Sequence, residues 1–134
     1  MSALNDNLNT SIEGYIRVYM GDALVWEGPN AVTATAPEIV TTTLGGVSNW
    51  LNNISPAASS VILAFGANHT VTFPATNQVR FTASFDGPSF NGTFDELKLS
   101  SLSLGDFSTK TGLSITKTAS QIMYVQWDLT ITVA

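Results

Sequence analysis

Hydrophobic and polar residues alternate most regularly near the end of the chain, over residues 123–133. An alternation with a period of two predicts a β-strand that buries one face. A slip of one residue would expose every apolar side chain, so we expect a fixed register and a central place in a sheet. The apolar positions are Met123, Val125, Trp127, Leu129, Ile131 and Val133, and between them stand Tyr124, Gln126, Asp128, Thr130 and Thr132.

Residues 12–20 and 79–85 show the same alternation. Gly21-Asp22 follows the first of these segments and precedes a second apolar run at 23–27. A two-residue Gly-Asp connection is typical of a β-hairpin, because glycine accepts the positive φ that the turn needs. The sequence therefore predicts a hairpin that ends at Gly28-Pro29-Asn30, followed later by a half-buried strand at 79–85.

The middle of the chain gives shorter strand signals. We expect residues 53–59 to form a loop around Pro56, and residues 60–65 to form a buried strand, because they contain the longest apolar run. Residues 71–73 predict a short strand that Pro74 stops.

The segment from residue 93 onward predicts further strands. Phe94 and Leu97 fall out of phase, so a strand at 93–99 should carry a bulge at Asp95-Glu96. Short strands are expected near 102–104 and 113–117.

Residues 36–52 carry the one convincing helical pattern. Thr35 and Glu38 fit a capping box around Pro37. Gly45-Gly46 weakens the helix by roughly 1 kcal/mol per residue relative to alanine, so this helix should need a sheet to lie on. Its apolar face consists of Ala36, Val40, Leu44, Val47 and Leu51.

These elements together predict a mainly β fold. Seven to nine short strands with one α-helix inserted near 36–52 favour a two-layer antiparallel β-sandwich, jelly-roll-like in outline. Residues 12–134 are expected to form this single domain, since no repeat or linker divides them. Residues 1–11 are polar apart from Leu4 and Leu8, and we expect an N-terminal arm that does not fold alone.

The composition is acidic and poor in charge. Charged residues make up 11% of the 134 residues and the net charge is −5, whereas about 25% is typical. Such a surface suits a chain inside a large assembly, although an ordinary neutral-surfaced β domain would share it. The five basic residues do not cluster, which argues against nucleic-acid binding. No apolar run or N-terminal leader pattern predicts a membrane span or a secretory signal.

Few residues are suited to catalysis. No cysteine is present, and His69 lies in a predicted loop without a serine nucleophile motif nearby. Asp86 and Asp95-Glu96 could serve acid–base chemistry or bind a hard cation. Adjacent strand residues point to opposite faces, however, so we interpret Asp95-Glu96 as a bulge whose charges protect a sheet edge. The sequence predicts a protein that is not an enzyme and has no cofactor or metal.

Tyrosines on polar strand faces are the best candidates for binding a partner. Tyr15, Tyr19 and Tyr124 combine a large contact area with a polar hydroxyl. With Leu4 and Leu8 of the arm, they form the predicted interface. Exposed single tyrosines also occur without any function, so that interpretation stays open as well.

The order of segments carries a resemblance. A hairpin at 14–30 and a strand at 79–85 precede a turn-rich stretch at 90–97. The ending, Lys117-Thr118-Ala119-Ser120 followed by a strand through Trp127-Asp128-Leu129-Thr130-Ile131-Thr132, contributes most. Over about residues 12–134, the chain resembles small virion structural proteins of tailed bacteriophages.

This resemblance implies a β-rich virion protein, most of all a capsid decoration (cement) protein that stabilises the assembled capsid by protein–protein contacts. It implies a homo-oligomer, often a trimer in cement proteins. The implied partners are the major capsid protein or other virion subunits, in a virion assembled in the host cytoplasm, and no active-site residue is implied. The alternative is a tail- or fibre-associated module that grips host-surface glycans through exposed aromatics such as Tyr19 and Trp50.

Overall fold

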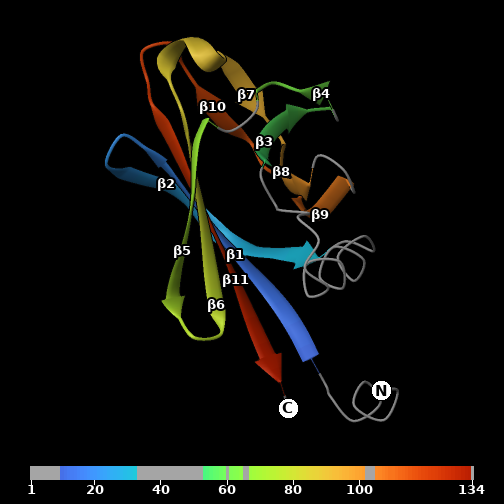
Figure 1. Ribbon diagram of the computed structural model, residues 1–134. Helices are drawn as coiled ribbons and strands as arrows, with labels where there is room; N and C mark the ends of the chain where they lie inside the picture. The colour runs from blue at the N-terminus through green and yellow to red at the C-terminus, as the bar shows by residue number, and fades with distance from the viewer. Residues whose placement is uncertain (1–9, 33–52, 60, 65–66, 102–104, 134) are drawn as a thin grey trace.

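The computed structural model describes residues 10–32, 53–59, 61–64, 67–101 and 105–133 (Figure 1). Within these ranges the chain is almost entirely β-structure. The strands are β1 (Thr10–Met20), β2 (Ala23–Val32), β3 (Asn53–Ala58), β4 (Val61–Ile62), β5 (Ala67–Ala75), β6 (Gln78–Phe85), β7 (Gly92–Phe94), β8 (Glu96–Ser101), β9 (Gly105–Lys110), β10 (Ile115–Lys117) and β11 (Met123–Val133), and a 3-10 turn, η1, spans Gly87–Ser89.

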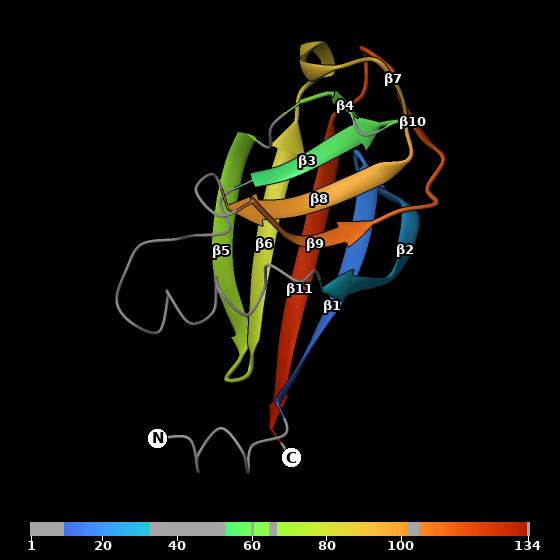
Figure 2. The same ribbon diagram turned by 90° about the vertical axis from the view of Figure 1, so that its right-hand side faces the viewer.

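The strands pair in antiparallel fashion. A five-stranded part has the order β2-β1-β11-β6-β5, and a four-stranded part has the order β4-β3-β8-β9. The end of β2 joins the two parts, because Ala31 and Val32 pair with β9. Figure 2 shows β3, β8 and β9 running across one face of β6, β11 and β1. A separate two-stranded ladder joins β7 to β10.

The buried apolar side chains of both parts form one cluster. Strand β11 lies at the centre of the five-stranded part, between β1 and β6, and contributes Trp127, whose side chain is fully buried. Burial of such large side chains away from water is the main force that holds sheets face to face. The cluster's largest members from the two parts are Ile16, Phe81, Phe85, Met123, Trp127, Ile54, Leu97, Leu99 and Phe107.

The alternating segments are confirmed as strands. Met123, Val125, Trp127 and Leu129 are buried in β11, which is central as predicted. The hairpin of β1 and β2 turns at Gly21, whose φ of 58° is the positive value that glycine accepts most readily. The mainly β prediction with antiparallel sheets is therefore confirmed.

The break predicted at Asp95-Glu96 marks a change of sheet. Strand β7 ends at Phe94 and pairs with β10, whereas β8 begins at Glu96 and pairs with β3 and β9. Asp95 is the one residue between them. The irregularity was placed correctly, but it separates two strands instead of bending one.

The predicted loop at 53–59 is wrong, because residues 53–58 form β3 and Ile54 to Ala57 are buried. Pro56 stands opposite Leu97 of β8. Its carbonyl oxygen points the other way and accepts the Leu63 N–H at 2.9 Å. In an antiparallel strand the N–H and C=O of one residue point to the same side, so the N–H that proline lacks is not one that β8 needs.

The predicted buried strand at 60–65 is also wrong. Of the described residues 61–64, only Val61–Ile62 form a strand, β4, and both of its side chains are exposed. Strand β4 is the outermost strand of the four-stranded part. Its apolar residues therefore lie at a sheet edge, which a run of hydrophobic letters cannot reveal.

Two prolines do not end their strands as expected. Strand β2 continues through Gly28-Pro29-Asn30 to Val32, and β5 continues through Pro74. Each proline lies where its strand is the outermost of the five-stranded part. An outer strand has one side without a ladder, which is why sheets tolerate proline mainly in such strands.

Other predictions fall on or next to undescribed residues. The helix at 36–52, the strand near 102–104 and Leu4 and Leu8 lie outside the described residues. Of the predicted arm at 1–11, the structure describes Thr10 and Ser11, which pair with β11. In the part of the chain that the structure describes, the only helical turn is η1. No helix in that part is long and apolar enough to cross a membrane.

Candidate functional site

The outer face of the five-stranded part carries the three predicted tyrosines. Here "outer face" means the side of β2, β1, β11 and β6 that points away from the core. Tyr19 and Tyr124 stand directly opposite each other on neighbouring strands. Tyr15 lies four residues from Tyr19 along β1, about 13 Å at 3.3 Å per residue. The fold therefore brings two of the three tyrosines together and leaves the third apart.

Asp128 is the buried centre of an ion-pair network on this outer face. Arg80 donates to its two carboxylate oxygens at 2.8 and 3.0 Å. Arg17 lies 3.5 Å away on the opposite neighbouring strand, and the Asp128 side chain is only 5% exposed. The hydrogen bond from Arg80 to Asp128 raises the pKa of Arg80 above its ordinary value. One carboxylate thus links β6, β11 and β1 by charge.

A second polar cluster begins at Tyr15. Its hydroxyl donates to Glu27 Oε1 at 2.6 Å. The Arg17 guanidinium lies 4.8 Å from the centre of the Tyr15 ring and 3.9 Å from Glu27. The hydrogen bond to Glu27 raises the pKa of Tyr15, because ionisation would place two negative charges together. The ring and hydroxyl of Tyr15 are therefore both engaged within the chain.

An apolar corner lies beside Tyr19 and Tyr124, at the turn of the β1–β2 hairpin. Leu24 pairs with Tyr19, and the Gly21 N–H donates to the carbonyl of Ile122 at 2.9 Å. We call Leu24, Val25, Ile122 and Tyr124 the hairpin corner. Their exposed fractions are 44%, 48%, 42% and 39%. Several large exposed apolar side chains near one turn favour a contact site for another protein.

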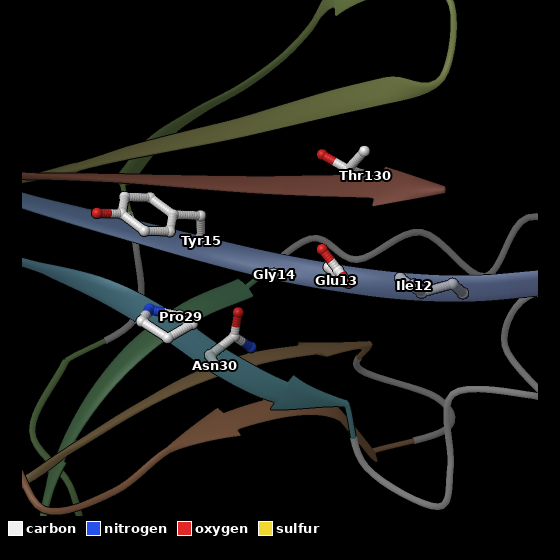
Figure 3. Close-up of a pocket in the computed structure, with 7 residues that line it drawn as sticks. All are labelled: Ile12, Glu13, Gly14, Tyr15, Pro29, Asn30 and Thr130. Carbon is white, nitrogen blue, oxygen red and sulfur yellow. The ribbon is translucent and has the colours of Figure 1, made fainter. Parts of the chain in front are cut away.

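A groove lies at the other end of the same two strands, where β1 and β2 diverge. Its volume is about 550 Å³, and Figure 3 shows its lining. Asn30 Nδ2 donates to Ser108 Oγ and so ties the end of β2 to β9. A Cβ at Gly14 would overlap the Asn30 side chain in its present position, so these two residues pack closely. The lining residues are Ile12, Glu13, Gly14, Tyr15, Pro29, Asn30 and Thr130.

The candidate catalytic residues are not gathered. His69 lies in β5 and not in the predicted loop. The Asp95 carboxylate accepts the Ser59 N–H at 3.2 Å, which caps the end of β3. Glu96 lies 4.0 Å from Lys98, and Asp86 is exposed before η1. Among the described residues, no three histidine, aspartate or glutamate side chains form a group that could hold a metal ion.

One buried charge lies far from the outer face. The Lys117 ammonium donates to the carbonyls of Gly87, Phe90 and Thr118 at 3.0 to 3.1 Å. Burial lowers the pKa of Lys117. All three donors of the ammonium are used within the fold, so this lysine holds η1 against the segment after β10.

Sequence reasoning missed most partners of the tyrosines. Exposure of one of the two residues Leu24 and Val25 could have been found, because a strand buries only alternate residues and 23–26 is an unbroken apolar run. The pairing of Arg17 and Arg80 with Asp128 depends on strand order, and no local signal contains that order.

Comparison with known proteins gives no relative. No family model matches the chain, and neither the curated proteins nor the solved structures contain a match. Any functional assignment therefore depends on the sequence pattern and on the geometry described above.

Proposed function

We propose that this chain is a virion structural protein of a tailed bacteriophage, most specifically a capsid decoration protein that stabilises the assembled capsid through protein–protein contacts. The observation that supports it best is the hairpin corner, a group of exposed apolar side chains that includes Tyr124 and lies next to Tyr19. Exposed apolar area with tyrosine at its border matches the composition of protein interfaces.

The finer fold assignment belongs to the same proposal. We take the two parts of the sheet as the layers of a β-sandwich, because their buried side chains form one cluster. The sandwich is jelly-roll-like in that the first and last described strands, β1 and β11, pair side by side within one layer. In this proposal the outer surfaces of the sandwich contact the capsid, and the protein acts without catalysis.

The neighbouring ion pairs favour a rigid contact surface. Asp128, Arg17 and Arg80 satisfy one another within the chain, so a partner that docks here need not neutralise an isolated buried charge. The proposed partners are the major capsid protein or other virion subunits, and the proposed state is a homo-oligomer with a trimer favoured. The proposal includes no nucleic-acid, membrane or cofactor contact.

Particle binding tests the proposal. Purified chain is added to particles of the encoding phage that lack it, and bound protein is measured by co-sedimentation and located by electron microscopy. The double substitution of Leu24 and Val25 by serine should lower binding about ten-fold or more, as hot-spot residues do. Val61→Ser is the matched control, because Val61 is 65% exposed in β4 of the other layer.

Two results would count against decoration. One is absence of the chain from the capsid surface, and the other is equal loss of binding in the Val61 control. The alternative, a tail-associated module for host-surface glycans, predicts binding on a glycan array that is lost with Tyr19→Ala or Trp50→Ala. The engagement of Tyr15 by Glu27 and Arg17 leaves it poorly placed to stack on a sugar.

A further inference from the structure

The groove lies beside an incomplete strand edge. Strand β1 pairs with β11 along its whole length, from Thr10 to Met20. It pairs with β2 only from Gly14 onward, because β2 turns away after Asn30 to pair with β9. Residues 10–13 of β1 therefore have a strand on one side only, among the strands that the structure describes. Two residues of this stretch, Ile12 and Glu13, line the groove, and a strand edge without a neighbour offers its backbone N–H and C=O groups for pairing.

The groove has room for a short piece of extended chain. Its volume is about 550 Å³, and its lining includes Ile12 and Glu13 of the stretch of β1 that lacks a second neighbouring strand among the described strands.

We propose that an N-terminal segment of a second copy of this chain, drawn from residues 1–9, adds to β1 as an extra strand in this groove. Strand addition to a free edge is a common mode of peptide binding, in which main-chain hydrogen bonds give affinity. The inference goes beyond the virion role proposed above and does not depend on it.

The chemistry of the groove fits this segment. Ile12 is partly buried against the core, whereas Glu13 is exposed, so an added strand meets one apolar and one polar face. Leu4 and Leu8 are four residues apart and share one face of an extended chain. Asp6 is the only charged side chain among residues 1–9, which keeps repulsion from Glu13 small.

The position of the segment permits reciprocal exchange. Residues 1–9 lead directly into Thr10, the first residue of β1, two residues before Ile12 of the groove. Nine extended residues reach at most about 30 Å, enough to cross to a neighbour and enter its groove. Two copies can then exchange segments about a two-fold axis, and a ring can do so in sequence.

Cross-linking tests the proposal, because the chain has no native cysteine. A chain with Asn5→Cys is mixed with one carrying Glu13→Cys, and a short bis-maleimide is added. If Leu4 lies beside Ile12, Asn5 points to the opposite face of the added strand, which is the face that Glu13 occupies on β1. We expect the mixed covalent dimer to exceed the control by about ten-fold or more, since a docked cysteine has a millimolar effective concentration.

The matched control replaces Glu13→Cys by Thr72→Cys, which is exposed in β5. A synthetic peptide of residues 1–9 should lower the yield of the mixed dimer. A yield no greater than that of the control would overturn the proposal. A chain carrying both Asn5→Cys and Glu13→Cys that closes only within itself would also overturn it, because its own N-terminal segment would then fill the groove.

Discussion

Arg80 and Asp128 stand directly opposite each other on β6 and β11 and form a two-point ion pair. Asp128 is on the outer face of the sheet, yet its side chain is only 5% exposed, whereas that of Arg80 is 33% exposed. The two arginines on either side of Asp128 shield the carboxylate from water. A charge buried in this way depends on its partners.

Breaking this pair should destabilise the fold. Asp128→Asn leaves two guanidinium groups without their shared carboxylate, and we expect it to lower the free energy of unfolding by about 1–3 kcal/mol. Urea unfolding of Asp128→Asn, Arg80→Gln and the double variant forms a double-mutant cycle, which gives the interaction energy between Arg80 and Asp128. A coupling energy near zero would show that Arg80 and Asp128 contribute independently.

The Tyr15 hydroxyl should ionise above the ordinary tyrosine pKa of about 10. Glu27→Ala should lower the pKa of Tyr15, because the hydrogen bond and the nearby negative charge are both removed. NMR titration of ¹³C-labelled tyrosine measures the pKa of Tyr15, and the Tyr15→Phe variant identifies its signal. Because the folded pKa is the higher one, the contribution of this contact to stability is present below pH 10 and is lost as pH rises through the folded pKa.

An unchanged Tyr15 pKa in Glu27→Ala would contradict this assignment. Tyr19→Phe serves as the control, because Tyr19 has no contact with Glu27 in the strand register and should leave the Tyr15 signal in place.

Lys117 should be important for stability in spite of its charge. Lys117→Met keeps the length of the side chain but leaves the carbonyls of Gly87 and Phe90 without their donor. We expect the free energy of unfolding to fall by about 2–4 kcal/mol. Lys110→Met is the control, since Lys110 contacts the Trp26 ring at 5.7 Å and should lose no more than about 1 kcal/mol. Equal effects in the two variants would refute a structural role specific to Lys117.

Substitution of two phenylalanines on adjacent strands should change stability to very different extents. Phe85 in β6 is fully buried, and Phe73 in β5 is 75% exposed. Phe85→Ala should lower the free energy of unfolding by about 3–5 kcal/mol through the cavity that it leaves. Phe73→Ala should change it by less than about 1 kcal/mol. Thermal or urea unfolding measures both, and a large loss in Phe73→Ala would mean that this side chain is covered in solution.

The candidate site was predictable only in part. The alternation in β1 and β11 placed Tyr15, Tyr19 and Tyr124 on outer faces, because a strand turns successive side chains to opposite sides. It could not show that Tyr19 meets Tyr124 while Tyr15 meets Glu27. Those neighbours depend on which strands lie side by side and in which register.

The sequence by itself determined which segments become strands where a period of two is sustained, as in 123–133, and where Gly21 lets the chain reverse. These features are local, because they follow from side-chain direction and from backbone freedom at single residues. Only the tertiary structure decided that Pro56 lies in a buried strand, that Val61 and Ile62 lie at an edge, and that β2 leaves β1 at Asn30 to form the groove. The physical reason is that burial and hydrogen-bond partners come from distant strands, so neither can be read from neighbours in the chain.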